Sequence, residues 1–266
     1  MSGGLVNGMR VLVLGGITSY RALFNWITPW ILIPTFLIGP ITQILLFAYL
    51  GRASGVESDE FFVIGNALQY AAIPCLFAMG NTIGNERQSK TLGIILSTPA
   101  ARIPLFVGRA LPVILNGWVV AVFALVAGGA IFSIDVPSSA YLPIVLVSLL
   151  ASFSCTGLGL VGAALALRVR ETAVLSNLIM GVLLIFCGVN VALSALPQWM
   201  ESVGRVLPFT HGIEAARAVV AGADWSEVAG LVGTEVLIGV VYLLIGLVML
   251  HYLEIESHRR STLDIA

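Results

Sequence analysis

Long stretches without a charged residue divide this sequence and limit the folds open to it. Six runs of 18 or more residues contain no Asp, Glu, Lys or Arg: Ala22–Gly51, Phe61–Asn85, Ala110–Ile134, Val136–Leu167, Thr172–Met200 and Val236–Leu253. A bilayer core about 30 Å thick needs roughly 20 apolar residues in helical conformation. The runs therefore predict an all-α membrane protein with six transmembrane helices in a domain spanning residues 27–253.

The composition points to lipid as the solvent of most of the chain. Hydrophobic residues make up 58% of the sequence and charged residues 10%, whereas a soluble domain carries about 25% charged residues. So few charges cannot cover a water-exposed surface, and a net charge of -1 gives no indication of a nucleic-acid partner. Cys75, Cys155 and Cys187 all lie inside apolar runs, so we expect them to be small packing residues rather than disulfide or metal ligands.

The two ends of the chain differ from the domain between them. In residues 1–26, Arg10 and Arg21 interrupt an apolar pattern, which is typical of an amphipathic helix lying in the membrane interface. The alternative is a partly helical tail. Residues 254–266 are polar, and we expect them to form a cytoplasmic tail.

The distribution of basic residues predicts the orientation, because cytoplasmic loops of membrane proteins are enriched in Lys and Arg. With the N-terminus inside and six spans, ten basic residues fall on the cytoplasmic side: Arg10, Arg21, Arg87, Lys90, Arg102, Arg109, Arg168, Arg170, Arg259 and Arg260. Three fall outside: Arg52, Arg205 and Arg217. Both termini are therefore expected in the cytoplasm.

The connection between the last two predicted spans, from Pro197 to Val228, is too polar to cross a membrane and too apolar for a solvated loop. Tryptophans lie near both of its ends, as expected at a membrane interface. Thr210 is a candidate N-cap for a helix that runs to Val220. We expect either two short re-entrant helices dipping into the outer leaflet or a single surface helix over the external mouth.

The predicted spans contain few ionisable residues that could couple transport to an ion gradient. Glu235 is expected close to the end of the last span, near the interface, and His251 at the other end. Transporters driven by protons or ions use ionisable groups inside their spans. The single lysine, Lys90, does not follow the glycine pattern of a phosphate-binding loop. The sequence thus predicts that energy for uphill transport enters from a partner.

One polar stretch, Asn85–Ala100, lies between two long apolar runs on the predicted cytoplasmic side. Glu86 and Lys90 are four residues apart, which favours a helical ion pair, and Leu92 and Leu96 share one helical face. The stretch therefore predicts a short amphipathic helix that could receive a force from a partner. A solvated loop helix is the alternative.

The same residues resemble a known signature. The sequence ERQSKTLGIILSTPA is similar to the signature of ABC-2 type permeases, the membrane subunits of ABC exporters of the daunorubicin-resistance and nodulation-factor kind. Lys90 stands where that family usually has Gly, and Gly93 where it usually has Glu. LPFTHGIEAAR, Leu207–Arg217, is similar to the external segment before the family's last span.

The resemblance implies a set of functional residues. The coupling helix that contacts the ATPase would contain Glu86, Arg87, Lys90, Thr91, Leu92, Leu96 and Pro99. The external re-entrant segment would contain Pro208, His211, Glu214 and Arg217.

The resemblance also implies partners and a location. The chain would be a permease subunit of an ATP-driven exporter in the cytoplasmic (inner) membrane of a bacterium, moving a hydrophobic or amphipathic substrate such as a drug, natural product, peptide or lipid. It would pair with a second permease, identical or paralogous, and with two copies of a separate ATPase subunit. ATP and Mg²⁺ would bind to that subunit, and this chain would need no cofactor.

Two other functions are considered. Export of a lipid-linked glycan would use the same mechanism, although glycan exporters of this fold usually lack the coupling signature. An intramembrane enzyme or a non-transporting scaffold is the third possibility. Catalysis would need a paired nucleophile and base, or metal ligands, at membrane depth, and the sequence predicts no Asp or Glu at mid-depth.

Overall fold

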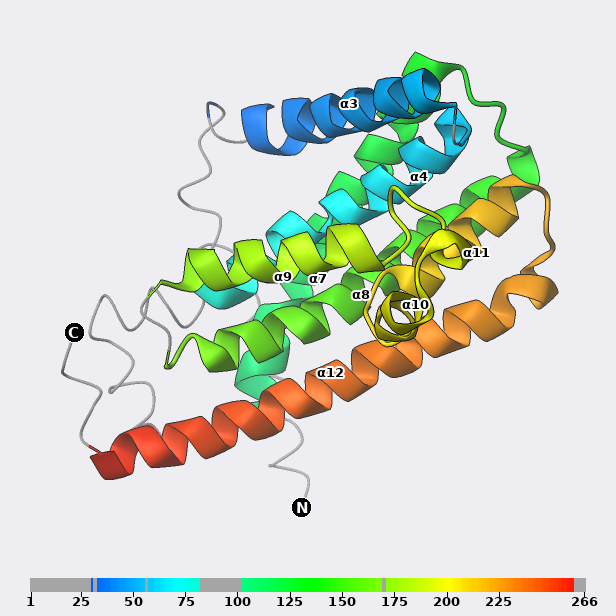
Figure 1. The fold of residues 1–266 in the computed structure, drawn as a ribbon. Coiled ribbons are helices and arrows are strands. Elements are labelled where there is room, and N and C mark those ends of the chain that lie inside the picture. Colours follow the sequence, from blue (N-terminus) through cyan, green and yellow to red (C-terminus); the bar gives the residue numbers. More distant parts are fainter. Residues whose placement is uncertain (1–29, 31–32, 56, 82–101, 169–170, 261–266) are drawn as a thin grey trace.

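The computed structural model describes residues 30, 33–55, 57–81, 102–168 and 171–260, and these fold into an all-helical bundle (Figure 1). The longest elements are α3 (Gly39–Ser54), α7 (Arg102–Phe132), α8 (Tyr141–Leu165) and α12 (Trp225–Arg260). Shorter helices are α4 (Asp59–Tyr70), α9 (Thr172–Phe186), α10 (Gln198–Gly204) and α11 (Thr210–Val220). Two π-helical turns, η1 (Ile33–Ile38) and η2 (Pro74–Ala78), extend α3 and α4, and two 3₁₀ turns, η3 (Ser138–Ala140) and η4 (Leu193–Ala195), lie in connections.

Among the described residues, five helical segments are long and apolar enough to cross a membrane: Ile33–Ser54, Asp59–Asn81, Val107–Phe132, Ser138–Leu165 and Trp225–Leu253. They agree in place with five of the six predicted runs. The sixth, Thr172–Met200, does not form one long helix. Its helix α9 has 15 residues, which reach about 22 Å at 1.5 Å per residue and fall short of a bilayer core.

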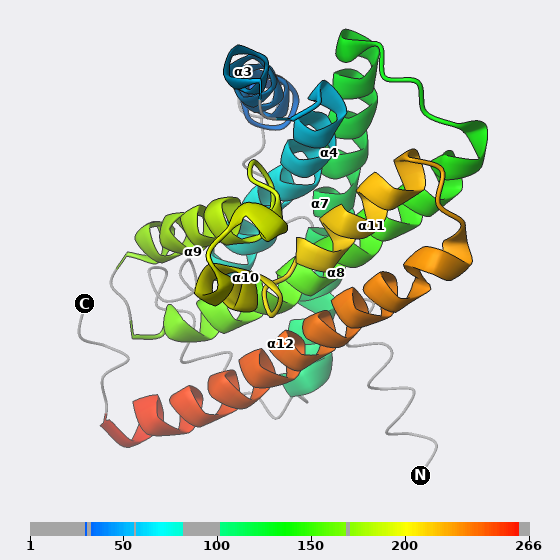
Figure 2. The ribbon, with the colours of Figure 1, turned by 45° about the vertical axis from the view of Figure 1, so that its right-hand side comes forward.

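Helix α8 occupies the centre of the bundle, and α12 runs along it (Figures 1 and 2). Small residues on α8 and α12 make this close approach possible. A Cβ on Gly157 would lie 2.7 Å from the backbone oxygen of Gly239 in α12, and one on Gly239 would lie 2.8 Å from the Cα of Ser154. The glycines therefore allow the backbones of α8 and α12 to touch.

The remaining helices surround this pair. Helix α4 and its η2 extension pack on α7 and α8, and α3 lies across α4. Burial is highest in the Asp59–Asn81 and Ser138–Leu165 spans and lowest in Ile33–Ser54, so α3 is an outer helix. Cys75, Cys155 and Cys187 are free and buried, which confirms their prediction as packing residues.

Three predicted features lie wholly or partly outside the described residues. The interfacial helix at residues 1–26 does so completely, and so do all seven predicted coupling residues, because the structure describes nothing between residues 81 and 102. At the other end, α12 continues to Arg260, so the predicted tail begins as an extension of the last helix.

Candidate functional site

The candidate site is an interrupted segment, Thr172–Val220, made of α9, the connection at 187–209 and α11. The break begins at Gly188, whose φ of 71° is left-handed. The thiol of Cys187, at the end of α9, donates a hydrogen bond to the backbone oxygen of Pro208 at 3.2 Å. The end of α9 therefore meets the start of α11, with α10 between them in the chain.

The region predicted as the connection between the last two spans, Pro197–Val228, contains two short helices, α10 and α11, the number that the first of the two sequence alternatives gives. Eight of the 11 residues of α11 are buried, because the helix packs against α12, α8 and α4. A single exposed surface helix would bury one face at most. Helix α11 is instead an internal element of the bundle.

Both ends of the break face a charged side chain. At the end of α9, the guanidinium of Arg217 in α11 donates to the backbone oxygens of Gly188 at 2.8 Å and Val189 at 3.0 Å. These carbonyls lie just beyond the helix C-terminus, where the helix dipole favours a cation. The planar fork of an arginine can reach both oxygens at once.

The same guanidinium ties the break to the first turn of α4. Its Nη2 donates to the backbone oxygen of Phe61 at 2.9 Å, and its Cζ lies 3.4 Å from the centroid of the Phe61 ring. Gly65 is the residue that allows this approach, since a Cβ there would lie 2.6 Å from Nη2 of Arg217. Arg217 thus joins α11, the break and α4.

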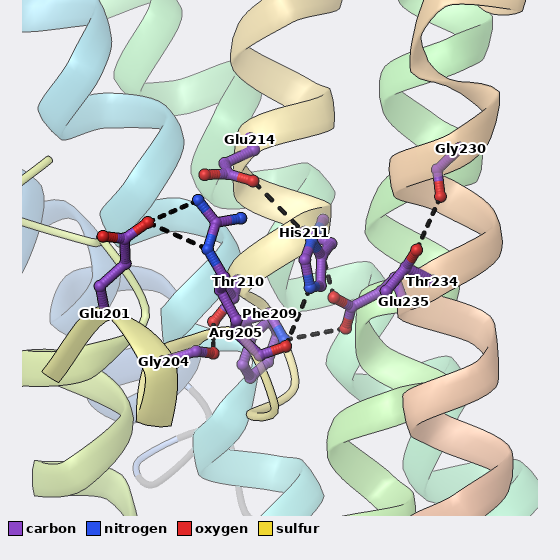
Figure 3. Close-up of polar contacts among 11 residues, drawn as sticks. Glu201, Gly204, Arg205, Phe209, Thr210, His211, Glu214, Gly230, Thr234 and Glu235 are labelled. Carbon is purple, nitrogen blue, oxygen red and sulfur yellow. Dashed lines mark hydrogen bonds and ion pairs between the residues drawn. The ribbon is translucent and has the colours of Figure 1, made fainter. Parts of the chain in front are cut away.

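At the start of α11, the cap comes from another helix. Glu235 of α12 accepts hydrogen bonds from the backbone N–H groups of Phe209 at 2.8 Å and Gly212 at 3.1 Å (Figure 3). The first N–H groups of a helix have no partner within it, and the positive end of the helix dipole favours an anion. The hydroxyl of Ser154 in α8 donates a third hydrogen bond to Glu235.

The predicted role of Thr210 is wrong in detail. Phe209, with a left-handed φ of 74°, is the N-cap residue, and it provides no side-chain cap. Thr210 is the first residue of α11, and its hydroxyl donates to the backbone oxygen of Gly204 at 2.6 Å (Figure 3). A carboxylate from a distant helix fills the capping position, so the local sequence pattern identified the helix start but not its partner.

The expectation that Glu235 lies close to the end of the last span does not hold, since the candidate span runs from Trp225 to Leu253. Its side chain is fully buried, ten residues into α12 from Trp225, or about 15 Å along the helix axis. An unpaired charge is expensive in such surroundings. Three hydrogen-bond donors and the positive end of the α11 dipole compensate for this cost. A hydropathy pattern along the chain contains no information about these donors.

The other residues predicted for the external segment gather beside these contacts. His211 shares a hydrogen bond of 2.9 Å between its Nε2 and the backbone oxygen of Arg205, and its Nδ1 lies 3.8 Å from a carboxylate oxygen of Glu214 (Figure 3). Glu214 and Arg217 line a small cavity of about 230 Å³ together with the Glu201–Arg205 ion pair. The predicted set Pro208, His211, Glu214 and Arg217 is therefore brought together around one end of the interrupted segment.

A polar network holds the far side of the break. Asn66 in α4 donates from Nδ2 to the Oδ1 of Asn190 at 2.8 Å, and it accepts from Nε2 of Gln43 at 3.0 Å. Gln43 also donates to Gln69 at 2.8 Å. These amides join α3, α4 and the connection after α9, so their role is helix packing.

Comparison with known proteins fits this architecture. A bundle of apolar helices long enough to cross a membrane is the architecture of a multi-pass membrane protein. The sequence matches the family described as "ABC-2 family transporter protein" over residues 57–248, and the chain belongs to that family. No curated protein matched the sequence.

Membership sets the general role of the chain. It is a membrane subunit of an ABC-2 transporter, and such a subunit lacks ATPase activity of its own. ABC-2 permeases generally pair with ABC ATPase subunits. The match covers the interrupted segment and Glu235, three of the five candidate spans completely, and the last span as far as Val248.

Proposed function

We propose that this chain is the permease subunit of an ATP-driven exporter that moves a hydrophobic or amphipathic substrate outward across a bacterial cytoplasmic membrane. Two permease chains, identical or paralogous, would assemble with two separate ATPase subunits. Both termini and the Asn85–Ala100 stretch would face the cytoplasm, and the substrate path would lie between the two permeases.

The observation that carries the proposal, beyond family membership, is how Glu235 is used. It is the fully buried acidic residue among those that the structure describes, and its hydrogen bonds go to Ser154, Phe209 and Gly212. Coupling to an ion gradient needs an ionisable group that can exchange its ion or proton. A carboxylate held by three protein donors supports a structural role, so the energy is better supplied by a partner.

The interrupted segment supports a role in opening the path. Interrupted helices in transporters line the substrate site or move during transport. Arg217 and Glu235 connect the break to α4 and α12, so a displacement of either helix would reach α11. A partner can drive that change only if it binds one conformation more tightly than the other.

The experiment that tests the proposal reverses two charges in the predicted coupling helix. The double variant Glu86→Arg/Arg87→Glu should still insert, but we expect it to recover at least about tenfold less co-expressed ATPase subunit in pull-downs, a loss of about 1.4 kcal/mol. ATP hydrolysis by the reconstituted complex should no longer drive export of a fluorescent amphiphile from vesicles.

A matched control reverses the ion pair that joins α3 to α4. Arg52 donates to Asp59 through Nε at 2.7 Å, and the swap Arg52→Asp/Asp59→Arg keeps the pair in reversed order. We expect this control to retain the ATPase subunit. Normal ATPase recovery and export by the Glu86/Arg87 variant would overturn the coupling role.

A further inference from the structure

A second cavity, of about 600 Å³, lies away from the break, at the end of the bundle where α4 begins and α7 ends. Its walls come from α4, α7, α8 and the last residue of α11, and they are mostly aliphatic; representative residues are Val63, Leu125, Val126, Ile144 and Val220. Figure 2 shows the α7–α8 connection at the same end of the bundle as the end of α11. A cavity of this volume is in the range that holds a drug-sized molecule.

Two adjacent glycines of α7 show which side of the helix is open. A Cβ on Gly128 would lie 2.8 Å from Val63, so this glycine is needed for contact with α4. A Cβ on Gly129, which lines the cavity, would meet nothing within 4 Å. Packing therefore fills the space at Gly128 and leaves it empty at Gly129.

The mouth of the cavity carries a carboxylate with no partner among the described residues. Asp135 lines the cavity from the α7–α8 connection and is exposed. Tyr141, which is 60% exposed, also lines the mouth, and an aromatic face attracts cations.

We propose that this cavity binds an amphipathic monocation, with its apolar body between α4, α7 and α8 and its cationic group against Asp135 and Tyr141. Charge complementarity carries this assignment, since Asp135 is the charged member of the described lining. The inference deepens the proposed function by naming a substrate class, and it rests on that function for its role in transport. Binding itself can be tested on the permease alone.

The test uses two probes of nearly equal size and opposite charge, tetraphenylphosphonium and tetraphenylborate. Their binding is measured on the full chain in phosphatidylcholine nanodiscs, and binding to empty nanodiscs is subtracted. We expect saturable binding of the cation at an affinity at least about tenfold above that of the anion, equivalent to about 1.4 kcal/mol. Asp135→Asn should remove most of this difference.

The second part of the test fills the cavity with a side chain. Gly129→Leu should abolish cation binding, because the new side chain enters open space. Gly181→Leu is the matched control: it lies in apolar helix α9, its Cβ also meets nothing within 4 Å, and it does not line the cavity. Unchanged elution and melting temperature of each variant would show that folding is retained.

Three results would overturn the inference. They are equal affinity for the two probes, binding unaffected by Gly129→Leu in a folded protein, and loss on cavity filling without any effect of Asp135→Asn. The last would indicate a site for neutral lipid chains. Failure of the proposed function looks different: cation binding would persist in the nanodiscs while the complex with ATPase showed no ATP-driven export.

Discussion

Glu235 in α12 accepts a hydrogen bond from the backbone N–H of Gly212 at 3.1 Å, so the last helix of the bundle caps the first turn of α11. The cap is a tertiary contact across 23 residues of sequence. Together with Arg217 at the other end of the break, it places a carboxylate at the N-terminus of α11 and a guanidinium beyond the C-terminus of α9. The predictions below test these contacts.

Removing the Glu235 carboxylate should destabilise the fold. Glu235→Ala leaves the N–H groups of Phe209 and Gly212 without an acceptor, and we expect a loss of about 2–4 kcal/mol in the free energy of unfolding. Glu235→Gln keeps one acceptor oxygen and should lose less. Thermal melting of the detergent-solubilised protein measures both effects.

The neighbouring residue provides a control for this substitution. The hydroxyl of Thr234 donates to the backbone oxygen of Gly230 within the same helix and is exposed, so Thr234→Ala should change stability by less than about 0.5 kcal/mol. In the assembled transporter, ATP-driven activity of Glu235→Gln should remain within about threefold of wild type, a barrier change below 1 kcal/mol. Complete loss of activity with normal ATPase assembly would instead favour a proton-linked mechanism.

Replacing Arg217 should show whether its planar fork is needed. Lysine cannot reach the oxygens of Gly188, Val189 and Phe61 together, so Arg217→Lys should lower stability by about 2–3 kcal/mol, in the range for hydrogen bonds to a charged group. The measurement is the same melting assay. Arg205→Lys serves as the comparison: its side chain is half exposed and pairs with Glu201 one turn earlier in the chain, and its effect should stay below about 1 kcal/mol. Equal losses for the two variants would contradict the assignment.

Adding a methyl group at Gly65 should disturb the same junction from the side of α4. The Cβ of Gly65→Ala would meet the backbone oxygen of Val189 and Nη2 of Arg217, and the expected cost is about 1–3 kcal/mol of stability. Gly181→Ala, which places its methyl group in open space, should be neutral or stabilising by up to about 1 kcal/mol. Tolerance of Ala at both positions would show that the packing around Gly65 is looser than described.

Breaking the amide network around Asn66 should lower stability by less than the loss of the Glu235 carboxylate. Asn66→Leu removes the hydrogen bonds to Gln43 and Asn190, and interhelical hydrogen bonds in membranes average about 0.6 kcal/mol each. We therefore expect a loss of about 1–2 kcal/mol once the unpaired amides are included. Asn177→Leu is the control, because that amide is exposed and bonds to Ala173 in its own helix. A chemical-unfolding series in mixed micelles separates the two outcomes.

The sequence predicted the features that depend on neighbouring residues and missed those that depend on contacts between distant residues. Runs of uncharged residues predicted five long helices close to their observed positions, since crossing a bilayer depends on local apolar content. The same reasoning predicted one span from Thr172 to Met200, where the helix ends at Phe186. A left-handed glycine and distant hydrogen-bond partners create that break, and a hydropathy pattern contains neither.

In the external segment, the sequence indicated some of the residues at the break and missed another. Its resemblance to a family motif pointed to Pro208, His211, Glu214 and Arg217, which lie beside the break, and their role in transport stays a prediction. The carboxylate that caps the segment was missed, although a lone acidic residue beside an 18-residue uncharged run is a visible signal. The expectation that charged residues lie near a membrane interface placed Glu235 at the end of the last span instead.

The sequence by itself determined that this protein is a helical membrane bundle, where most helices lie, and which family it resembles, because each depends on composition and short motifs. Only the tertiary structure decided that Glu235 is buried and that Arg217 holds the end of α9. The reason is physical: the cost of a buried charge depends on the donors and acceptors around it. Those of Glu235 come from residues 81, 26 and 23 positions away in the chain.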